Sequence, residues 1–101
     1  MSSTEYNQAQ QTIADGNYGK FVAALDRLRN LNAVDEYGNT LLHWAAAYKR
    51  LEMVKELIEK KKIDITIKNK TQKTAYDLVV DASATDMSFF EVKQYLKTKY
   101  Q

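Results

Sequence analysis

The sequence predicts an all-α fold built from repeated helix pairs. Apolar residues recur at the three- and four-residue spacing of one helix face, for example in the stretch 21–28. The 101 residues include no proline and only three glycines, which argues against a turn-rich sandwich or barrel. The segment 35–44 also returns in weaker form 34 residues later, at 69–78. The chain therefore repeats one structural unit.

The first unit is expected to consist of two short antiparallel helices. Residues 5–15 have a narrow apolar stripe and many glutamines, as in a helix with one buried side. The Asp-Gly-Asn sequence at 15–17 has the composition of a helix stop and a turn. A second amphipathic helix follows over 21–28. Residues 30–34 are then predicted to be an extended connector that leads into the next turn.

A turn followed by a capped helix marks the start of the middle unit. Asp35 can form an Asx-type turn, and Gly38 can supply a positive φ. Thr40 stands where an N-cap belongs, in front of an apolar run. His43 is the third residue after Thr40, so its imidazole can reach back and share the hydrogen bonds of the cap. We therefore predict a turn at 35–38 and a helix that starts beside Thr40.

The two helices of the middle unit are predicted to differ in how much of their surface is buried. The stretch from Thr40 to about Tyr48 is almost all small or apolar, so it must be covered on both sides. The next helix begins near Leu51 and ends in the lysines 60–62, whose charge complements the helix dipole. Residues 63–67 alternate with period two. We predict an extended connector there, because the sequence contains no other good strand to pair with it.

The third unit begins with a helix at Thr74 and ends the repeat series. Residues 81–88 are polar and small, and the loop here is about four residues longer than in the middle unit. The last helix, 88–99, places apolar side chains on one face and charged ones on the other. This pattern is typical of a terminal cap on a stack of repeats.

Composition excludes several classes of site. The chain has no cysteine and one histidine, which removes disulfides, cysteine-ligated metals and multi-histidine metal sites. We expect no metal and no cofactor. Its N-terminal residues lack the pattern of a signal peptide, and its apolar runs are too short to span a membrane. We therefore expect no membrane association and an intracellular location, in the cytoplasm or the nucleus.

The net charge of +2 is unevenly distributed. Residues 1–48 carry a net −2, residues 49–73 a net +5, and residues 74–101 a net −1. The basic segment 49–73 leaves binding to nucleic acid or to an acidic partner as an alternative function. Acidic residues are interleaved with the lysines, and no series of aromatic residues accompanies them for base stacking. A solvated helix end is the simpler interpretation of the lysines 60–62.

These features together resemble the ankyrin repeat. The resemblance consists of a period near 33 residues, a turn followed by Thr-x-Leu-His-x-Ala-Ala, a second helix with Val-x-x-Leu-Ile, and Ile-Asp-Ile before the next turn. The matching positions of the middle unit are Asp35, Gly38, Thr40, Leu42, His43, Ala45, Ala46, Val54, Leu57 and Ile58. The resemblance implies an ankyrin-repeat solenoid of stacked antiparallel helix pairs with projecting turns. It divides the single domain 1–101 into an N-terminal capping repeat (about 5–34), a full repeat (35–68) and a divergent C-terminal capping repeat (69–101).

The chain departs from the family pattern at several positions. Leu41 replaces the usual proline, Asp77 stands at the position of the histidine, and Gln72 stands at that of the turn glycine. If Gln72 takes a positive φ, the third turn is strained by roughly 1 kcal/mol; otherwise it adopts another turn type. Lys49, where many repeats have a helix-ending glycine, raises the same question.

The resemblance implies a non-enzymatic protein-binding module, a small adaptor or regulator. Such repeats bind through turn tips and the concave face of the inner helices. Family position indicates these contact residues: Glu36, Tyr37, Asn39, Ala47, Tyr48, Lys70, Thr71, Lys73, Asp81 and Ala82. Tyrosine offers contact area and a hydroxyl at low entropic cost. The alternative interpretation of Tyr37 and Tyr48 is ordinary solvent-exposed aromatic residues in a tyrosine-rich chain.

The remaining candidates favour structural roles. His43 is expected to link its helix start to the neighbouring turn, because the sequence contains no recognisable nucleophile motif and no glycine-rich phosphate loop. We therefore expect no enzymatic activity. Trp44 is expected to be partly buried between units, with an exposed binding anchor as the alternative. The chain is expected to be monomeric on its own; a subunit that acts only within a larger assembly is the further alternative.

Overall fold

The computed structural model describes residues 4–100, and these contain helices and no strand. They measure 34 × 27 × 22 Å along their principal axes. The helices are α1 (Thr4–Asp15), α2 (Tyr18–Asp26), α3 (Leu41–Ala47), α4 (Leu51–Lys55), α5 (Ala75–Ser83) and α6 (Phe90–Lys99). A π-helical turn, η1 (Glu56–Lys60), continues α4, and a 3₁₀ turn, η2 (Met87–Phe89), precedes α6. The predicted all-α fold is confirmed.

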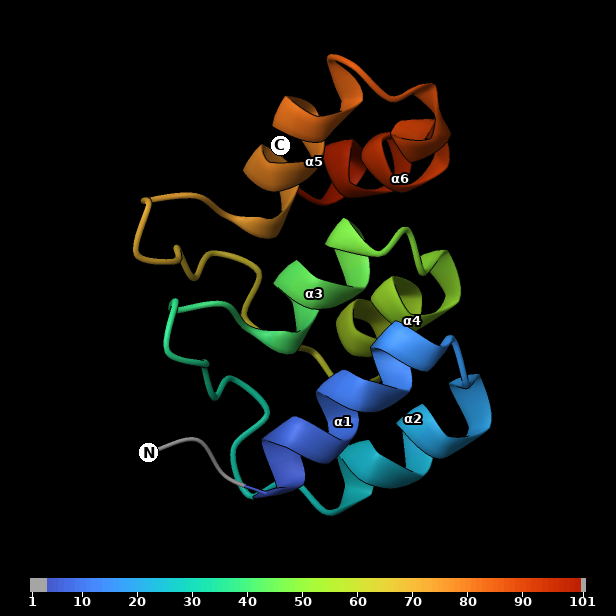
Figure 1. The fold of residues 1–101 in the computed structure, drawn as a ribbon, viewed down its shortest axis with the longest axis vertical. Coiled ribbons are helices and arrows are strands. Elements are labelled where there is room, and N and C mark those ends of the chain that lie inside the picture. Colours follow the sequence, from blue (N-terminus) through green and yellow to red (C-terminus); the bar gives the residue numbers. More distant parts are fainter. Residues whose placement is uncertain (1–3, 101) are drawn as a thin grey trace.

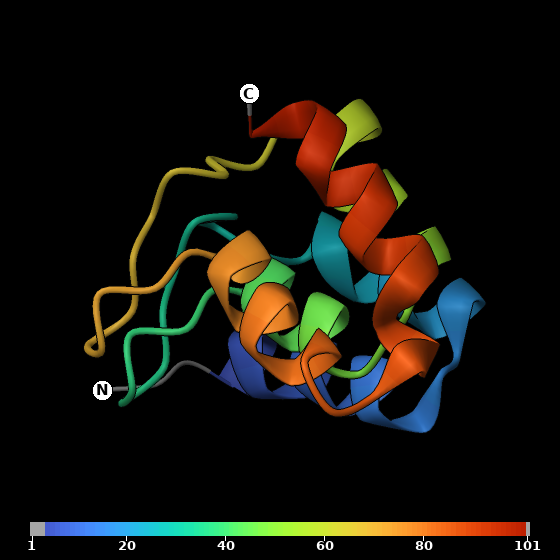
Figure 2. The ribbon, with the colours of Figure 1, turned by 90° about the horizontal axis from the view of Figure 1, so that it is seen from above.

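The helices form antiparallel pairs that stack in chain order. Figure 1 shows α1 with α2, α3 with α4, and α5 with α6 lying one above the other along the longest axis. Seen from above in Figure 2, α3 and α5 lie between the connecting turns on one side and the outer helix α6 on the other. The inner helices pack in series, α1 on α3 and α3 on α5. The turns project beyond the inner helices, on the side away from α2, α4 and α6.

The inner helices start where their cap residues predict. The Thr40 hydroxyl accepts a hydrogen bond from the backbone N–H of His43, and the Thr74 hydroxyl accepts one from Asp77. The side chains of His43 and Asp77 return the bond to the backbone N–H of the cap, so each pair forms a capping box. In α2, the Asn17 side chain accepts from the backbone N–H of Lys20. Local sequence therefore sets these helix starts.

The turn residues adopt a left-handed backbone, which the sequence predicts for Gly38 and leaves open for Gln72 and Lys49. Gly38 has φ +79°, Gln72 has φ +66° and Lys49 has φ +60°. The predicted strain at Gln72 follows from this positive φ, because a side chain is disfavoured there. Lys62, with φ +58°, was not predicted to be left-handed; it lies just beyond η1 and turns the chain out of the outer helix.

The hydrophobic core runs through the stack, with α3 at its centre. Leu41, Leu42, Ala45 and Ala46 of α3 are buried between α1 on one side and α5 on the other. Small alanines let the inner helices approach closely. The extra residues of the third unit lengthen its inner helix, since α5 has nine residues and α3 has seven, and the remainder form the connection through η2.

The C-terminal end of the stack is only partly closed. The rings of Tyr76 and Tyr100 stack with centroids 5.6 Å apart and cover one part of the end. Phe89 and Leu96 face the core as predicted. Met87 and Phe90, however, are 90% and 62% exposed. The outer side of this cap therefore carries two large apolar residues as well as charges, one in η2 and one at the start of α6.

Candidate functional site

The first turn is held by one carboxylate. Asp35 Oδ1 accepts hydrogen bonds from the backbone N–H groups of Tyr37 and Asn39, both at 2.9 Å. Asp35 Oδ2 accepts from Trp44 Nε1 at 2.9 Å. The Asx turn is thereby confirmed, and it leaves the side chains of Glu36 and Tyr37 exposed. Tyr37 is 60% exposed at the tip.

The second turn uses an amide in the same position. Asn69 Oδ1 accepts from the backbone N–H groups of Thr71 and Lys73, at 3.0 and 3.1 Å. It also accepts from the Thr71 hydroxyl at 2.7 Å. Asn69 can reproduce the acceptor role of Asp35 because an amide oxygen has the same reach as a carboxylate oxygen. Unlike Asp35, Asn69 contributes no charge.

The two turns are hydrogen-bonded to each other. The backbone N–H of Lys70 donates to the carbonyl of Tyr37 at 3.0 Å. Asn69 Nδ2 donates to Asn39 Oδ1 at 2.9 Å. A Cβ at Gly38 would lie 2.9 Å from the backbone nitrogen of Lys70, so only glycine allows this approach. The tips therefore keep a fixed spacing.

His43 links the two units. Its Nδ1 accepts from the backbone N–H of Thr40 at 3.0 Å, which leaves the proton on Nε2 to donate to the carbonyl of Lys73 at 2.9 Å. The side chain is 2% exposed, and burial lowers the pKa of the imidazole. The predicted linking role is confirmed. Residues 4–100 also contain no group of three or more metal-ligating side chains suited to hold an ion.

Trp44 and Tyr48 are the aromatic residues of the inner helix α3 and of its C-terminal end. Trp44 is half-buried, as the prediction of a partly buried scaffold residue requires, and its indole is fixed on Asp35. The Tyr48 ring meets the Trp44 ring edge-on, with centroids 5.9 Å apart. Tyr48 is 38% exposed. The half-buried Trp44 therefore packs against the exposed Tyr48.

The residues predicted to make contact differ in how free their side chains are. The exposed ones are Glu36, Tyr37, Ala47, Tyr48, Lys70, Thr71 and Asp81, and the half-buried ones are Asn39, Lys73 and Ala82. Four of these polar side chains already have partners: Asn39 binds Asn69, Thr71 binds Asn69, and Lys73 pairs with Asp81. Their groups position the turns, whereas Glu36, Tyr37, Tyr48 and Lys70 offer their tips to solvent.

A groove of about 640 Å³ lies between α1 and the first turn. It is lined by Asn7, Gln10, Val34, Asp35, Glu36, Tyr37 and Trp44. Asn7 and Gln10 were absent from the contact residues predicted by sequence, which all lay in the second and third units. The polar, glutamine-rich surface of the first helix was the signal for them. Its placement beside the tip depends on the packing of α1 against α3.

The basic segment does not form one patch. Lys60 Nζ lies 3.9 Å from Glu56 Oε1. Lys61 Nζ lies 3.1 Å from Oδ1 of Asp26, on the neighbouring outer helix. Lys70, in contrast, is at the second turn tip. Lysines of the same sequence segment are thus divided between the outer helices and the tips, and several are paired with acidic residues.

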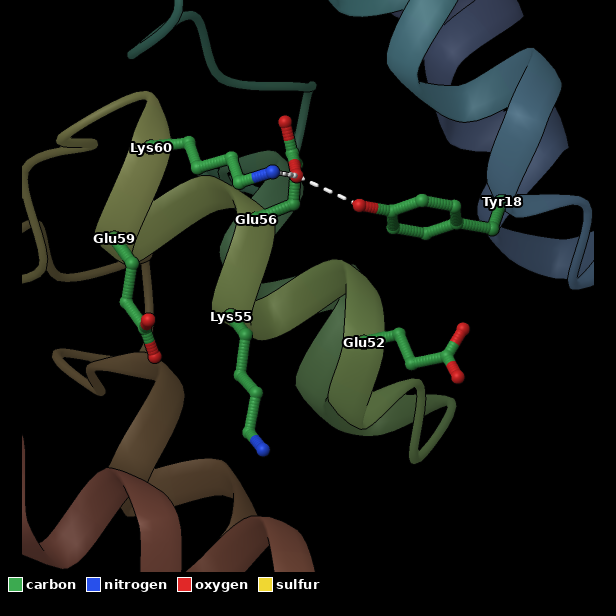
Figure 3. Close-up of a pocket in the computed structure, with 6 residues that line it drawn as sticks. All are labelled: Tyr18, Glu52, Lys55, Glu56, Glu59 and Lys60. Carbon is green, nitrogen blue, oxygen red and sulfur yellow. Dashed lines mark hydrogen bonds and ion pairs between the residues drawn. The ribbon is translucent and has the colours of Figure 1, made fainter.

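The outer surface of α4 and η1 carries a second recess, of about 370 Å³ (Figure 3). Three glutamates and two lysines line it, and Tyr18 reaches across from α2 to donate to Glu56 Oε1 at 2.7 Å. This hydrogen bond raises the pKa of the Tyr18 hydroxyl. Glu56 is only 6% exposed. The contact fastens α2 to the next outer helix.

The chain matches a family model and several known proteins. The model described as ankyrin repeats (many copies) matches residues 23–79. Alpha-latrotoxin-Lt1a from Latrodectus tredecimguttatus is 44% identical over 70 residues, which are 69% of this chain and 5% of the toxin. Oxysterol-binding protein homolog 2 from Saccharomyces cerevisiae is 38% identical over 58 residues, 57% of this chain and 4% of that protein. The chain thus spans about one-twentieth of the length of these curated relatives.

Two solved complexes contain chains of similar fold. A chain in the crystal structure of the yeast ribosomal protein Rps3 with its chaperone Yar1 has a TM-score of 0.74 and 27% identity, covering 91% of this chain and 65% of that one. A chain in the complex of the predatory endopeptidase Bd0816 from Bdellovibrio bacteriovorus with immunity protein Bd3460 has a TM-score of 0.75 and 27% identity, covering 97% of this chain and 47% of that one.

Within residues 4–100, no helix has the length and apolar character needed to cross a membrane.

Proposed function

Because the chain belongs to the ankyrin repeat family, whose repeats generally mediate protein–protein interaction and are generally non-enzymatic, we propose that it is a small adaptor or regulator. It binds a partner protein through its turn tips and inner-helix face. The units that present this face are the repeats 5–34, 35–68 and 69–101. Both structural neighbours come from protein complexes, which agrees with this role.

One observation carries the proposal: two tyrosines are exposed on this face without a role in the core. Tyr37 projects from the first tip, and Tyr48 ends the inner helix α3. Tyrosine is enriched among the residues that dominate binding energy at interfaces, because it adds a large, rigid contact area. The hydrogen bonds of Asp35 hold the tip without using either side chain. Both side chains are therefore available to contact a partner.

Affinity capture followed by mass spectrometry tests the proposal. We expect the double variant Tyr37→Ala/Tyr48→Ala to lose a partner that the unaltered chain retains, while its thermal stability changes little. Phe90→Ala is the matched control, because it removes an equally exposed aromatic ring from the C-terminal end of the stack. Capture that survives the double variant but not the control would show that the turn-tip face is not the binding surface.

The alternative of binding nucleic acid or an acidic partner through segment 49–73 has less support. Lys60 and Lys61 are paired with acidic residues on the outer helices, and Lys73 is paired with Asp81. A charge-driven interaction would weaken steeply between low and moderate salt. Binding of mixed nucleic acids with that salt dependence, and its loss on reversing the charges of Lys60–Lys62, would favour this alternative. The same capture experiment shows whether the chain acts only as a subunit of a larger assembly.

A further inference from the structure

We propose that the groove between α1 and the first turn binds a cationic side chain, arginine or lysine, of the partner. The proposal deepens the proposed function and rests on it for the existence of a protein partner. It assigns the chemistry of one contact. The groove, with its volume of about 640 Å³, is large enough to hold a long side chain.

The first step is the charge of the groove. Among residues 4–100, the carboxyl groups that line it belong to Asp35 and Glu36, and none of the lining residues is a lysine or an arginine. The hydrogen bonds to Asp35 come from two backbone amides and the Trp44 indole, which are neutral donors. Neither Asp35 nor Glu36 belongs to any of the ion pairs found among residues 4–100. The described residues therefore make the groove negative and supply it with no counter-charge.

The second step is the chemistry of its walls. Tyr37 and Trp44 line the groove together with Asn7 and Gln10. Cations bind favourably over the faces of tryptophan and tyrosine, and a guanidinium group also stacks on them. Amide oxygens accept hydrogen bonds from guanidinium or ammonium groups. An anion would meet the like charge of Asp35 and Glu36, and a purely apolar group would displace water from polar side chains of the groove.

The third step is the contrast with other recesses of the molecule. Four others in residues 4–100 each contain at least one basic side chain: Lys55 and Lys60, Lys49 and Arg50, Lys93, and Lys20 and Arg27. The second turn tip carries the exposed Lys70. A cationic group is thus repelled from the neighbouring tip and attracted to this groove. Charge therefore selects both the site and the orientation of a partner segment.

A titration with two matched probes tests this assignment. We would add N-acetyl-arginine amide, or its neutral isostere N-acetyl-citrulline amide, to the ¹⁵N-labelled chain and record amide spectra. The arginine probe should shift the Trp44 indole and the side-chain amides of Asn7 and Gln10, with weak but saturable binding. Because solvent-exposed carboxylate charge and a cation–π contact act together, the citrulline probe should bind about three- to tenfold more weakly.

Glu36→Gln is the variant of choice, since Glu36 makes no hydrogen bond that holds the turn, whereas Asp35 makes three. It should weaken the arginine probe about threefold and leave the citrulline probe unchanged. Equal binding of the two probes, shifts confined to another surface, or no saturable shift up to the solubility limit would each overturn the groove assignment. If that occurs while Tyr37→Ala/Tyr48→Ala still loses its partner, the proposed function stands and only the cationic contact fails.

Discussion

The middle and third units use the same helix start for different tasks. In the middle unit, His43 completes the cap of its own helix and also reaches the carbonyl of Lys73 in the following turn. In the third unit, Asp77 completes the cap alone. The imidazole has two nitrogens on opposite sides of a ring, so one residue can serve both units. The carboxylate at the end of the stack serves only its own helix.

The turn residues show the same division. Gly38 lies against the backbone of Asn69 and Lys70, so it needs both a left-handed backbone and the absence of a side chain. Gln72 has the same left-handed backbone but is exposed and is not followed by another turn of this kind. Backbone strain alone is tolerated at Gln72, whereas a side chain at Gly38 would also clash with the next turn. The histidine and the glycine of the family pattern are therefore needed in the middle unit because another turn packs against it.

The largest expected effect comes from cutting the histidine link. His43→Ala should lower the free energy of unfolding by about 2–4 kcal/mol, because a buried side chain and its bonds to Thr40 and Lys73 are lost. Denaturant titration followed by circular dichroism measures it. His43→Asp places the residue of the third unit at this position. Its free energy of unfolding should lie between those of the unaltered chain and His43→Ala, because aspartate restores the cap but not the bond to Lys73. A loss below about 0.5 kcal/mol for His43→Ala would contradict the importance of the link.

The turn glycine should rank next. Gly38→Ala should cost about 2–3 kcal/mol, the sum of left-handed strain and contact with the backbone of Lys70. Gly19→Ala is the control, because Gly19 lies within α2 and a Cβ there meets only the Asn17 side chain, at 3.8 Å. The control should be neutral or slightly stabilising, as alanine favours helices. Equal destabilisation of the two variants, measured by thermal unfolding, would refute the close-approach argument.

The histidine also predicts a pH dependence. Burial, which outweighs the opposing influence of the Lys73 carbonyl and of Asp35, lowers the pKa of His43 in the folded state. The unfolded chain then binds more protons below the ordinary imidazole pKa near 6.5, so stability falls as the pH drops through that range, by at most about 1.4 kcal/mol per pH unit. Denaturant titrations at several pH values measure the slope. His43→Asn should flatten it, and an unchanged slope would assign it to other groups.

The third unit should respond more weakly. Asp77→Ala should cost about 1 kcal/mol, the usual effect of losing one capping side chain. Asp81→Ala is the control, because its exposed ion pair with Lys73 should contribute close to nothing. A cost for Asp77→Ala as large as that of His43→Ala, in the same denaturant experiment, would mean that the two units are equivalent.

The smallest effect is a gain. Gln72→Gly should stabilise the chain by about 0.5–1 kcal/mol, because relief of left-handed strain exceeds the added entropy of the unfolded glycine. A shift of the thermal midpoint to higher temperature would show it. A lower midpoint would indicate that the Gln72 side chain makes a stabilising contact.

The features predicted from sequence are those that a few neighbouring residues decide. Helical spacing and the caps at Thr40 and Thr74 each depend on a short segment, and each is confirmed. For Gln72 the sequence leaves two turn types open, and the structure has the one with positive φ. The link from His43 spans 30 residues, and it was predictable because the resemblance to ankyrin repeats fixes which units are neighbours. The contact residues as a set remain a prediction.

The features that sequence did not predict depend on register between units. Arg50 donates to the carbonyls of Ile13 and Ala14, both at 3.0 Å, and so satisfies the end of α1 from the next unit. The burial of Glu56 follows from contact with Tyr18, 38 residues away. The groove beside the first turn likewise needs α1 to lie next to it. No local pattern specifies such distances.

The hydrogen bonds between the tips have a consequence for the entropy of association. Lys70 to Tyr37 and Asn69 to Asn39 hold the backbone of both turns before any partner arrives. Ordering a flexible loop on binding would cost free energy for each residue fixed. Here that cost has already been met during folding, so a partner has to immobilise only exposed side chains. A short stack can therefore present a small surface that is ready to bind.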